Sequence, residues 1–202
     1  MNNQRKKMTI VTREEINKRK DVLDAVASKT LHQFGSNFTQ IPGGHIQTDI
    51  ATASSIGGLI IFQENVDNLE KIIIEGGTGN ALLYEVQEAW ESLYRIMRTI
   101  ALNYGIDPIK GWEGSIPEEH YPIYSCEEMT RKLAQDFYRI CIEENLEKPF
   151  WKIAAVLVAV KLILAGRDLG ILDEKVGKAI AGYYLLAGSK TIPFKDALWS
   201  SF

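Results

Sequence analysis

The sequence predicts an all-α protein, a single-domain bundle of about six helices around a central apolar helix. Three observations lead to this prediction. First, apolar residues step by four and three through residues 82–100, which gives a seam over about five helical turns. Second, residues 50–62 and 150–165 are apolar on nearly every side of a helix, so other elements must cover them. Third, helix-capping patterns precede several of these segments.

The length and the charge distribution of the chain limit how many domains it can form and which partners it can bind. The 202 residues are 46% apolar, which suits one domain with a sizeable core. We expect residues 1–11 to form a basic arm, disordered or extended, and residues 12–202 to form a single helical domain. Residues 1–20 carry seven cations against two carboxylates, so the arm is either a solvated face or a contact for an anionic partner. The formal net charge of −3 argues against a general nucleic-acid-binding protein.

The chain opens with an amphipathic helix. Thr12 and Glu15 have the spacing of a capping box, and apolar residues then recur at helical intervals. The pattern predicts a helix over residues 13–34, ended by Gly35. A loop over residues 36–47 follows.

The central small-residue helix comes next. Thr48 and Asp49 are typical N-cap residues, and residues 50–62 carry no charge. One stripe of this helix holds only small residues, which would let a neighbouring backbone approach closely (Ala51, Ser55 and Gly58). Residues 64–79 are the least readable part of the chain. Within them, residues 69–74 fit either a short strand or the end of another helix.

The second half continues the helical pattern. Ser125 and Glu128 form a second capping box, and Asp173 is a further N-cap. Residues 106–124 form a long, proline-containing connection that is also the candidate subdomain boundary. We expect Gly188 to end the last helix. The four helices of this half are expected over residues 80–104, 126–145, 150–168 and 174–187.

The sequence favours a cytoplasmic protein without a transmembrane span. Its two cysteines form no Cys-x-x-Cys pair, and no secretory signal pattern precedes a cleavage site. The uncharged run over residues 50–63 is too short to cross a bilayer. Residues 150–165 contain Lys152 and Lys161 on opposite sides of a helix, so no orientation hides both from lipid. Both segments are therefore expected to be buried core helices.

Known catalytic and cofactor-binding motifs are missing. The sequence has no phosphate-binding loop, no dinucleotide-binding glycine pattern, and no His-Glu-x-x-His or Gly-x-Ser-x-Gly motif. The Glu-x-x-His pairs of di-iron bundles are also missing, and the three histidines come from separate regions. We therefore predict no cofactor and no metal site.

The strongest cluster of chemically capable residues precedes the central helix. Gly43, Gly44, His45, Thr48 and Asp49 join a flexible turn, a titratable imidazole, a hydroxyl and a carboxylate at a helix N-terminus. They are the candidate ligand-binding residues, and His45 and Asp49 are also candidate catalytic residues. The alternative interpretation is structural, with Thr48 or Asp49 capping the helix and His45 bonding to the nearby backbone.

Cys126 is the third candidate catalytic residue. It would occupy the first position of its helix, where the helix dipole lowers the pKa of a thiol. A nucleophile also needs a base, and the nearest histidine in the sequence, His120, lies in a loop. An incidental structural cysteine is the alternative.

These observations favour a helical binding or interaction protein, and self-association is one form of this hypothesis. Its support is the missing catalytic signature together with an apolar C-terminal tail, residues 193–202, which would dock on its own domain or on a second copy. The alternative is an enzyme of unrecognised type with a pocket at residues 43–49.

Overall fold

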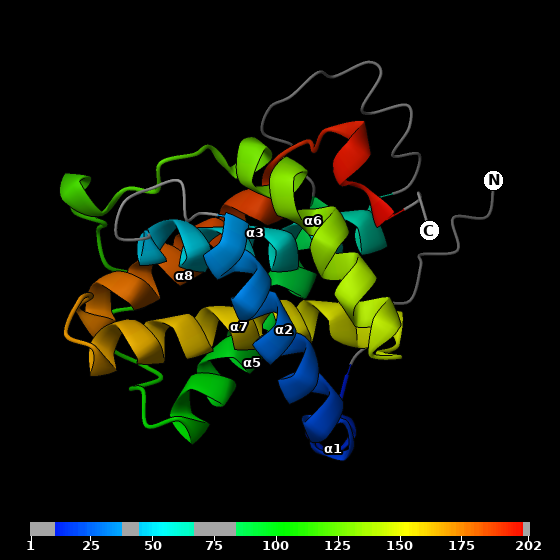
Figure 1. Cartoon of the computed structure of the whole chain (residues 1–202), viewed down its shortest axis with the longest axis horizontal. Coiled ribbons are helices and arrows are strands. Elements are labelled where there is room, and N and C mark those ends of the chain that lie inside the picture. The colour runs from blue at the N-terminus through cyan, green and yellow to red at the C-terminus, as the bar shows by residue number, and fades with distance from the viewer. Residues whose placement is uncertain (1–10, 38–44, 67–83, 200–202) are drawn as a thin grey trace.

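The computed structural model describes residues 11–37, 45–66 and 84–199 (Figure 1). These ranges contain seven α-helices and no strand, which confirms the predicted all-α bundle. Residues 1–10 of the predicted arm and the ambiguous segment 69–74 lie outside the described residues. The α-helices are α1 (Arg13–Lys18), α2 (Lys20–Asn37), α3 (Ile46–Asn65), α5 (Tyr84–Asn103), α6 (Cys126–Glu143), α7 (Lys148–Asp168) and α8 (Glu174–Lys190).

The first helix differs from the prediction because it breaks at Arg19. The capping box is present, since Thr12 and Glu15 exchange side-chain and backbone hydrogen bonds. Instead of one helix, however, α1 ends at Lys18 and α2 begins at Lys20 and runs past Gly35 to Asn37. The side chain of Arg19 is held by residues preceding and opening α7, which fixes the turn between the two helices.

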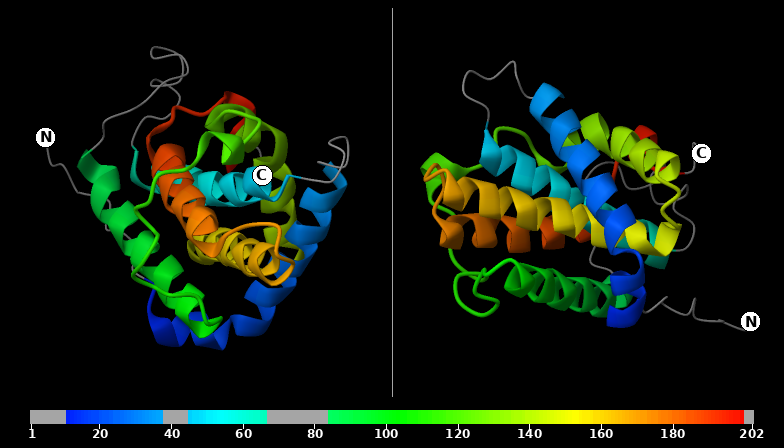
Figure 2. Two further views of the ribbon diagram at one scale, coloured as in Figure 1. Left: turned by 90° about the vertical axis from the view of Figure 1, so that its left-hand side faces the viewer. Right: turned by 60° about the horizontal axis from the view of Figure 1, so that its bottom comes forward.

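Helices α3 and α7 form the centre of the bundle. Helix α3 packs against α8, α7, α6 and α5, and α7 packs against α2, α5 and α8 (Figure 2). Every residue from Ile50 to Gln63 is buried, as is every residue from Phe150 to Val160. The near-continuous apolar sequence of both helices is thus explained by neighbours on all sides.

Helices α3 and α8 cross at glycines. A Cβ atom added to Gly58 would lie 2.5 Å from the backbone nitrogen of Ser189, and one added to Gly188 would lie 2.8 Å from the Cα atom of Ser55. The two backbones therefore touch, as the small-residue stripe predicts. The expectation that Gly188 ends the last helix is wrong, because α8 continues to Lys190. This glycine is needed for close approach and not for chain reversal.

The two lysines of α7 are accommodated by ion pairs to neighbouring helices. The Nζ atom of Lys152 lies 2.5 Å from Glu64 of α3, and that of Lys161 lies 2.7 Å from Asp24 of α2. By length and mean hydropathy, α7 is the one described helix that could cross a membrane, but 78% of its most apolar window is buried inside the protein. Its apolar surface is consequently used in the core.

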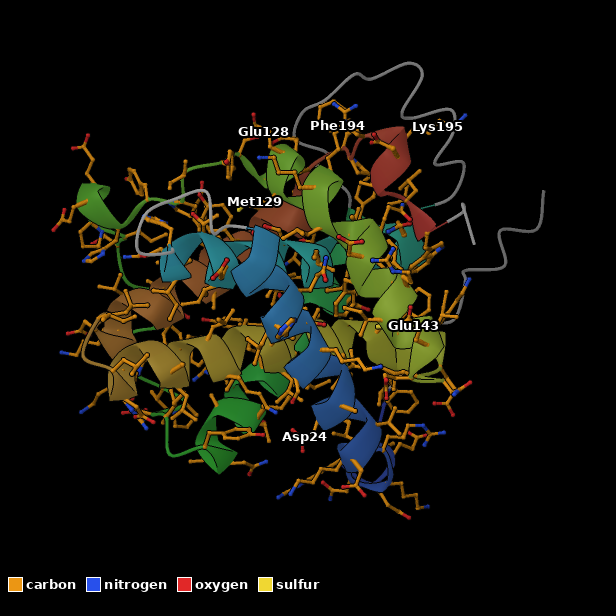
Figure 3. All side chains as sticks on the ribbon, viewed as in Figure 1. Asp24, Glu128, Met129, Glu143, Phe194 and Lys195 are labelled. Atoms are coloured by element: carbon orange, nitrogen blue, oxygen red, sulfur yellow. The ribbon has the colours of Figure 1, made fainter. Side chains whose placement is uncertain are left out.

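The C-terminal tail packs on its own chain through residue 199, beside the start of α6 (Figure 3). Gln135 of α6 donates to the carbonyl oxygens of Asp196 and Leu198, each at 2.7 Å. The Trp199 N–H donates to Gln63 of α3 at 2.9 Å, and Leu198 is buried. Only residues 195–197 form a short 3-10 helix, so these contacts hold an extended tail onto α6 and α3.

The long connection over residues 106–124 is packed against α5 and α8. The indole of Trp112 is buried, donates to the carbonyl oxygen of Asp107 at 2.9 Å, and meets Tyr94 of α5 edge-on at 6.1 Å. Gly182 of α8 leaves room for the Trp112 carbonyl, since a Cβ there would lie 2.9 Å from it. The proline-containing loop is anchored by this aromatic side chain, and its later residues His120 and Ile123 contact the start of α3 before the chain enters α6.

Candidate functional site

The cluster predicted before the central helix has a different capping residue from the one expected. Helix α3 begins at Ile46, and His45 is its N-cap, so the expected N-cap at Thr48 or Asp49 is wrong. The Nδ1 atom of His45 accepts from the Thr48 N–H at 3.3 Å and lies 2.7 Å from Thr48 Oγ1. The alternative interpretation of His45, a bond to the nearby backbone, is therefore seen.

Thr48 joins this cluster to the long loop. Because Nδ1 of His45 accepts from a backbone N–H, the Thr48 hydroxyl donates to the same ring nitrogen and leaves Nε2 protonated. The Thr48 hydroxyl oxygen then accepts from the Ile123 N–H at 3.1 Å. Gln47 lies 3.0 Å from Nδ1 of His120. The structure thus brings His120 beside His45, a pairing that the sequence spacing did not show.

His45 and Asp49 are both held toward their uncharged forms. Burial lowers the pKa of His45, and the neighbouring His120 lowers it further. Burial raises the pKa of Asp49 to about 7, and its Oδ1 atom is buried without a hydrogen-bond partner. A carboxyl group with this pKa can take or give a proton near neutral pH. Gly43 and Gly44, the other two residues of this candidate site, lie outside the described residues.

Cys126 lies apart from this cluster, beside Ser55, which is about two helical turns after Thr48 on α3. It occupies the first position of α6, as predicted, but its side chain is buried near Ser55 and Thr191. The expectation of a lowered pKa is wrong, because burial raises the pKa of this thiol to about 11. Burial outweighs the helix dipole here. Cys141 is likewise fully buried, and its pKa is raised for the same reason.

The residues before α3 favour a structural role over a metal site. Across the described parts of the chain, no group of three His, Cys, Asp or Glu side chains is placed to hold a metal ion. The Nδ1 atoms of both histidines are already engaged with the protein. What remains chemically available is the Asp49 carboxyl group and the two Nε2–H donors.

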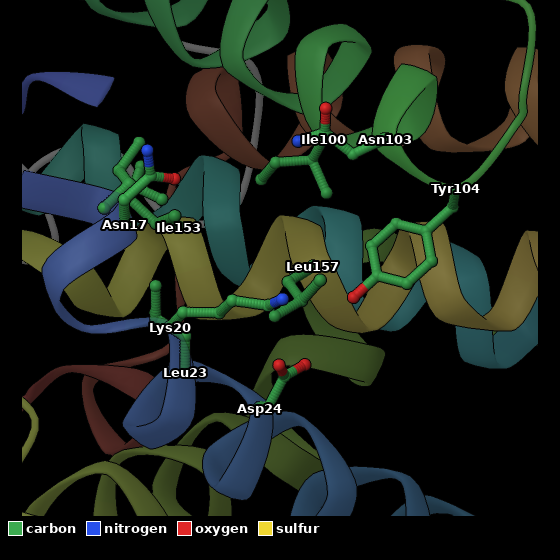
Figure 4. A pocket seen from close by; sticks show the side chains of 10 residues that line it. Asn17, Lys20, Leu23, Asp24, Ile100, Asn103, Tyr104, Ile153 and Leu157 are labelled. Carbon is green, nitrogen blue, oxygen red and sulfur yellow. The ribbon is translucent and has the colours of Figure 1, made fainter. Parts of the chain in front are cut away.

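A second candidate site is a pocket of about 280 Å³ between α1, α2, α5 and α7 (Figure 4). Its floor is apolar, and polar side chains surround the floor. The apolar lining residues are Ile16, Leu23, Ile100, Ile153 and Leu157, and the polar ones are Asn17, Lys20, Asp24, Asn103 and Tyr104. The lining thus combines the two features of a ligand pocket, an apolar surface and convergent polar groups, with a larger polar share than most.

The polar side of the pocket contains one carboxylate, Asp24, whose negative charge is balanced by a lysine of α7. Asp24 lies 2.7 Å from Lys161 of α7 and also interacts with the Tyr104 hydroxyl. Burial raises the pKa of Tyr104, and the negative charge of Asp24 raises it further, so this phenol remains protonated. Figure 4 shows Lys20 and the hydroxyl group of Tyr104 directed into the pocket from opposite sides.

Few features of the sequence indicate this pocket. Its residues come from segments around positions 20, 100 and 155, and only folding brings them together. Asn17, Lys20 and Asp24 look like an ordinary polar helix face. One available signal was Lys161, because a lysine inside an apolar helix requires an acid on a neighbouring element.

Comparisons with known proteins add no family to this picture. No protein-family model matches the chain, and searches among curated proteins and among solved structures find no match either. We therefore infer the function from the geometry of the chain itself.

Proposed function

We propose that this chain is a binding protein that holds a small amphipathic molecule in the pocket between α1, α2, α5 and α7. The observation that carries the proposal is the arrangement of the pocket, an apolar floor with ionisable and hydrogen-bonding groups at its edge. Burial of a hydrocarbon body on this floor supplies affinity, about 25 cal/mol for each Å² removed from water. The polar groups supply orientation.

The rigidity of the surrounding helices supports the same proposal. Ile153 and Leu157 belong to the central helix α7, and both are buried in the core. Ile100 belongs to α5, which packs against α7 and α3. A pocket built on packed helices is largely formed before its ligand arrives, so little ordering entropy opposes binding.

A binding experiment with eight-carbon molecules tests this function. 1-Octanol, octanoate and octylamine share one body and differ in the head group. We expect at least one of them to bind in calorimetry and to shift amide resonances of α2, α5 and α7. At a concentration 100 times its Kd, a ligand adds about 2.7 kcal/mol to the free energy of unfolding, which a thermal melt detects.

Filling the pocket should abolish this binding. Leu157→Trp adds a large ring at the floor, and Ile100→Phe fills the pocket from the opposite helix. Leu102→Trp is the matched control, because Leu102 lies on α5 near Ile100 but is 56% exposed and outside the pocket. The proposal is refuted if none of the three molecules binds. It is also refuted if both filling variants fold and bind as the unmodified protein does.

A further inference from the structure

The charges around the pocket do not cancel. Asp24 is the one carboxylate in the lining, and Lys161 already compensates it from α7. Lys20 lies one helical turn before Asp24, yet none of the ion pairs among the described residues, with a limit of 4.0 Å, involves its ammonium group. A lysine that precedes an acid by four residues is the less favourable order for a helical ion pair. The pocket therefore has one surplus positive charge.

The size of the pocket limits what it can hold. Its volume of about 280 Å³ lies near the lower end of ligand pockets, which span about 300–1,000 Å³. Since one water takes about 30 Å³ in the liquid, the space suits a molecule of roughly ten non-hydrogen atoms. A nucleotide or a long lipid would not fit within it.

Hydrogen-bonding groups near Lys20 fit an oxyanion. Asn17 precedes it at the end of α1, and its amide can donate a hydrogen bond. Lys20 itself is the first residue of α2. The acid Asp24 would repel a second negative charge.

We infer that the ligand is a small monocarboxylate whose aliphatic or aromatic body lies on the apolar floor and whose carboxylate pairs with the ammonium group of Lys20. This inference rests on the function proposed above and specifies its ligand class. One surplus cation selects one anionic group, and the apolar floor selects a body without further charges.

The same eight-carbon panel tests the inference, with octanedioate added as a dianion of equal length. We expect octanoate to bind about ten-fold more tightly than 1-octanol, the value of one charge-assisted hydrogen bond at a partly exposed site. Octylamine and octanedioate should bind more weakly than octanoate. Added salt should weaken octanoate binding and leave 1-octanol binding nearly constant.

Replacing Lys20 identifies the group responsible. Lys20→Met keeps a flexible apolar stem and removes the charge, so the ten-fold preference for octanoate over 1-octanol should disappear. Lys18→Met is the matched control, because Lys18 is exposed on α1, outside the pocket, and forms an ion pair with Glu14 at 2.8 Å. The control should keep the preference. Both lysines are exposed, so neither variant is expected to unfold.

The outcomes separate this inference from the proposed function. If 1-octanol or octylamine binds and Leu157→Trp prevents it, but octanoate is not preferred, the inference is wrong and the binding function stands. If octanoate is preferred and Lys20→Met retains the preference, the assignment to Lys20 is wrong. If no member of the panel binds, both proposals are overturned together.

Discussion

Asp49 carries an ionisable group where the fold does not support a charge, and its replacement by asparagine tests this reasoning. The pKa of Asp49 rises from 3.8 to about 7 on folding because burial penalises the carboxylate. The folded state therefore holds the proton more tightly than the unfolded chain. The contribution of Asp49 to the free energy of unfolding should be fully present below about pH 4 and should be lost as the pH rises through about 7.

The magnitude follows from the size of the pKa change. A rise from 3.8 to about 7 corresponds to about 4 kcal/mol at 1.36 kcal/mol per pH unit. Asp49 lies in the first turn of α3, where the helix dipole stabilises a negative charge by about 0.3–1 kcal/mol. We therefore expect Asp49→Asn to raise the free energy of unfolding by about 3 kcal/mol at pH 8 and by less at pH 5.

Urea unfolding at pH 5, 7 and 8 measures this difference. The unmodified protein should lose stability between pH 5 and pH 8 relative to Asp49→Asn, with unchanged m-values. Asp21→Asn is the control, since Asp21 occupies the first turn of α2 but is exposed. If Asp49→Asn were less stable than the unmodified protein at pH 8, the carboxylate would be ionised and stabilised in the fold, and the reasoning would fail.

Three further predictions concern the core and the tail. Gly58→Ala should lower the free energy of unfolding by about 2 kcal/mol or more, because its methyl group would meet the backbone of α8; an unchanged melt would contradict the crossing. Deleting residues 193–202 should cost about 3 kcal/mol through lost aromatic burial and leave the sedimenting species the same size, whereas a change of size would indicate docking between copies. Cys126 and Cys141 should react with a thiol reagent only as fast as the protein opens, and rapid labelling of the native protein would refute their burial.

The helices could be predicted where the signal was local. The seam of α5 and the two capping boxes depend on residues three or four positions apart, so a single sequence contains the whole pattern. The uncharged stretch before Gln63 also predicted its own burial, because no orientation of such a helix gives it a polar face.

The sequence-based predictions were wrong or incomplete where the role of a residue depends on a partner far away in the sequence. Gly188 has the local signature of a helix stop, but its lack of a side chain allows the backbone of α3 to pack directly against α8. Asp49 looks like a helix cap, but His45 takes that position and leaves Asp49 half-buried, with its Oδ1 atom buried and without a hydrogen-bond partner. The pairing of His120 with Gln47 joins positions 73 residues apart, which no spacing rule reveals.

The break at Arg19 shows how a missed local feature shapes the proposed site. The guanidinium of Arg19 donates to Glu147 at 2.9 and 2.6 Å and lies 4.3 Å from the ring centre of Phe150. These contacts tie the α1–α2 turn to the start of α7 and lower the pKa of Glu147 to about 2, chiefly through the hydrogen bond from Arg19.

Asn17 and Lys20 flank that turn, and both line the pocket. On a continuous helix, residues three positions apart lie about 60° apart around the axis, so Asn17 and Lys20 would share one face by helical geometry alone. What Arg19 adds is the position of this face relative to α7, because it ties the turn to the start of the helix that carries Ile153 and Leu157. The specificity of the pocket for an anion, as we propose it, therefore depends on the contact between Arg19 and the start of α7 as well as on Lys20 itself.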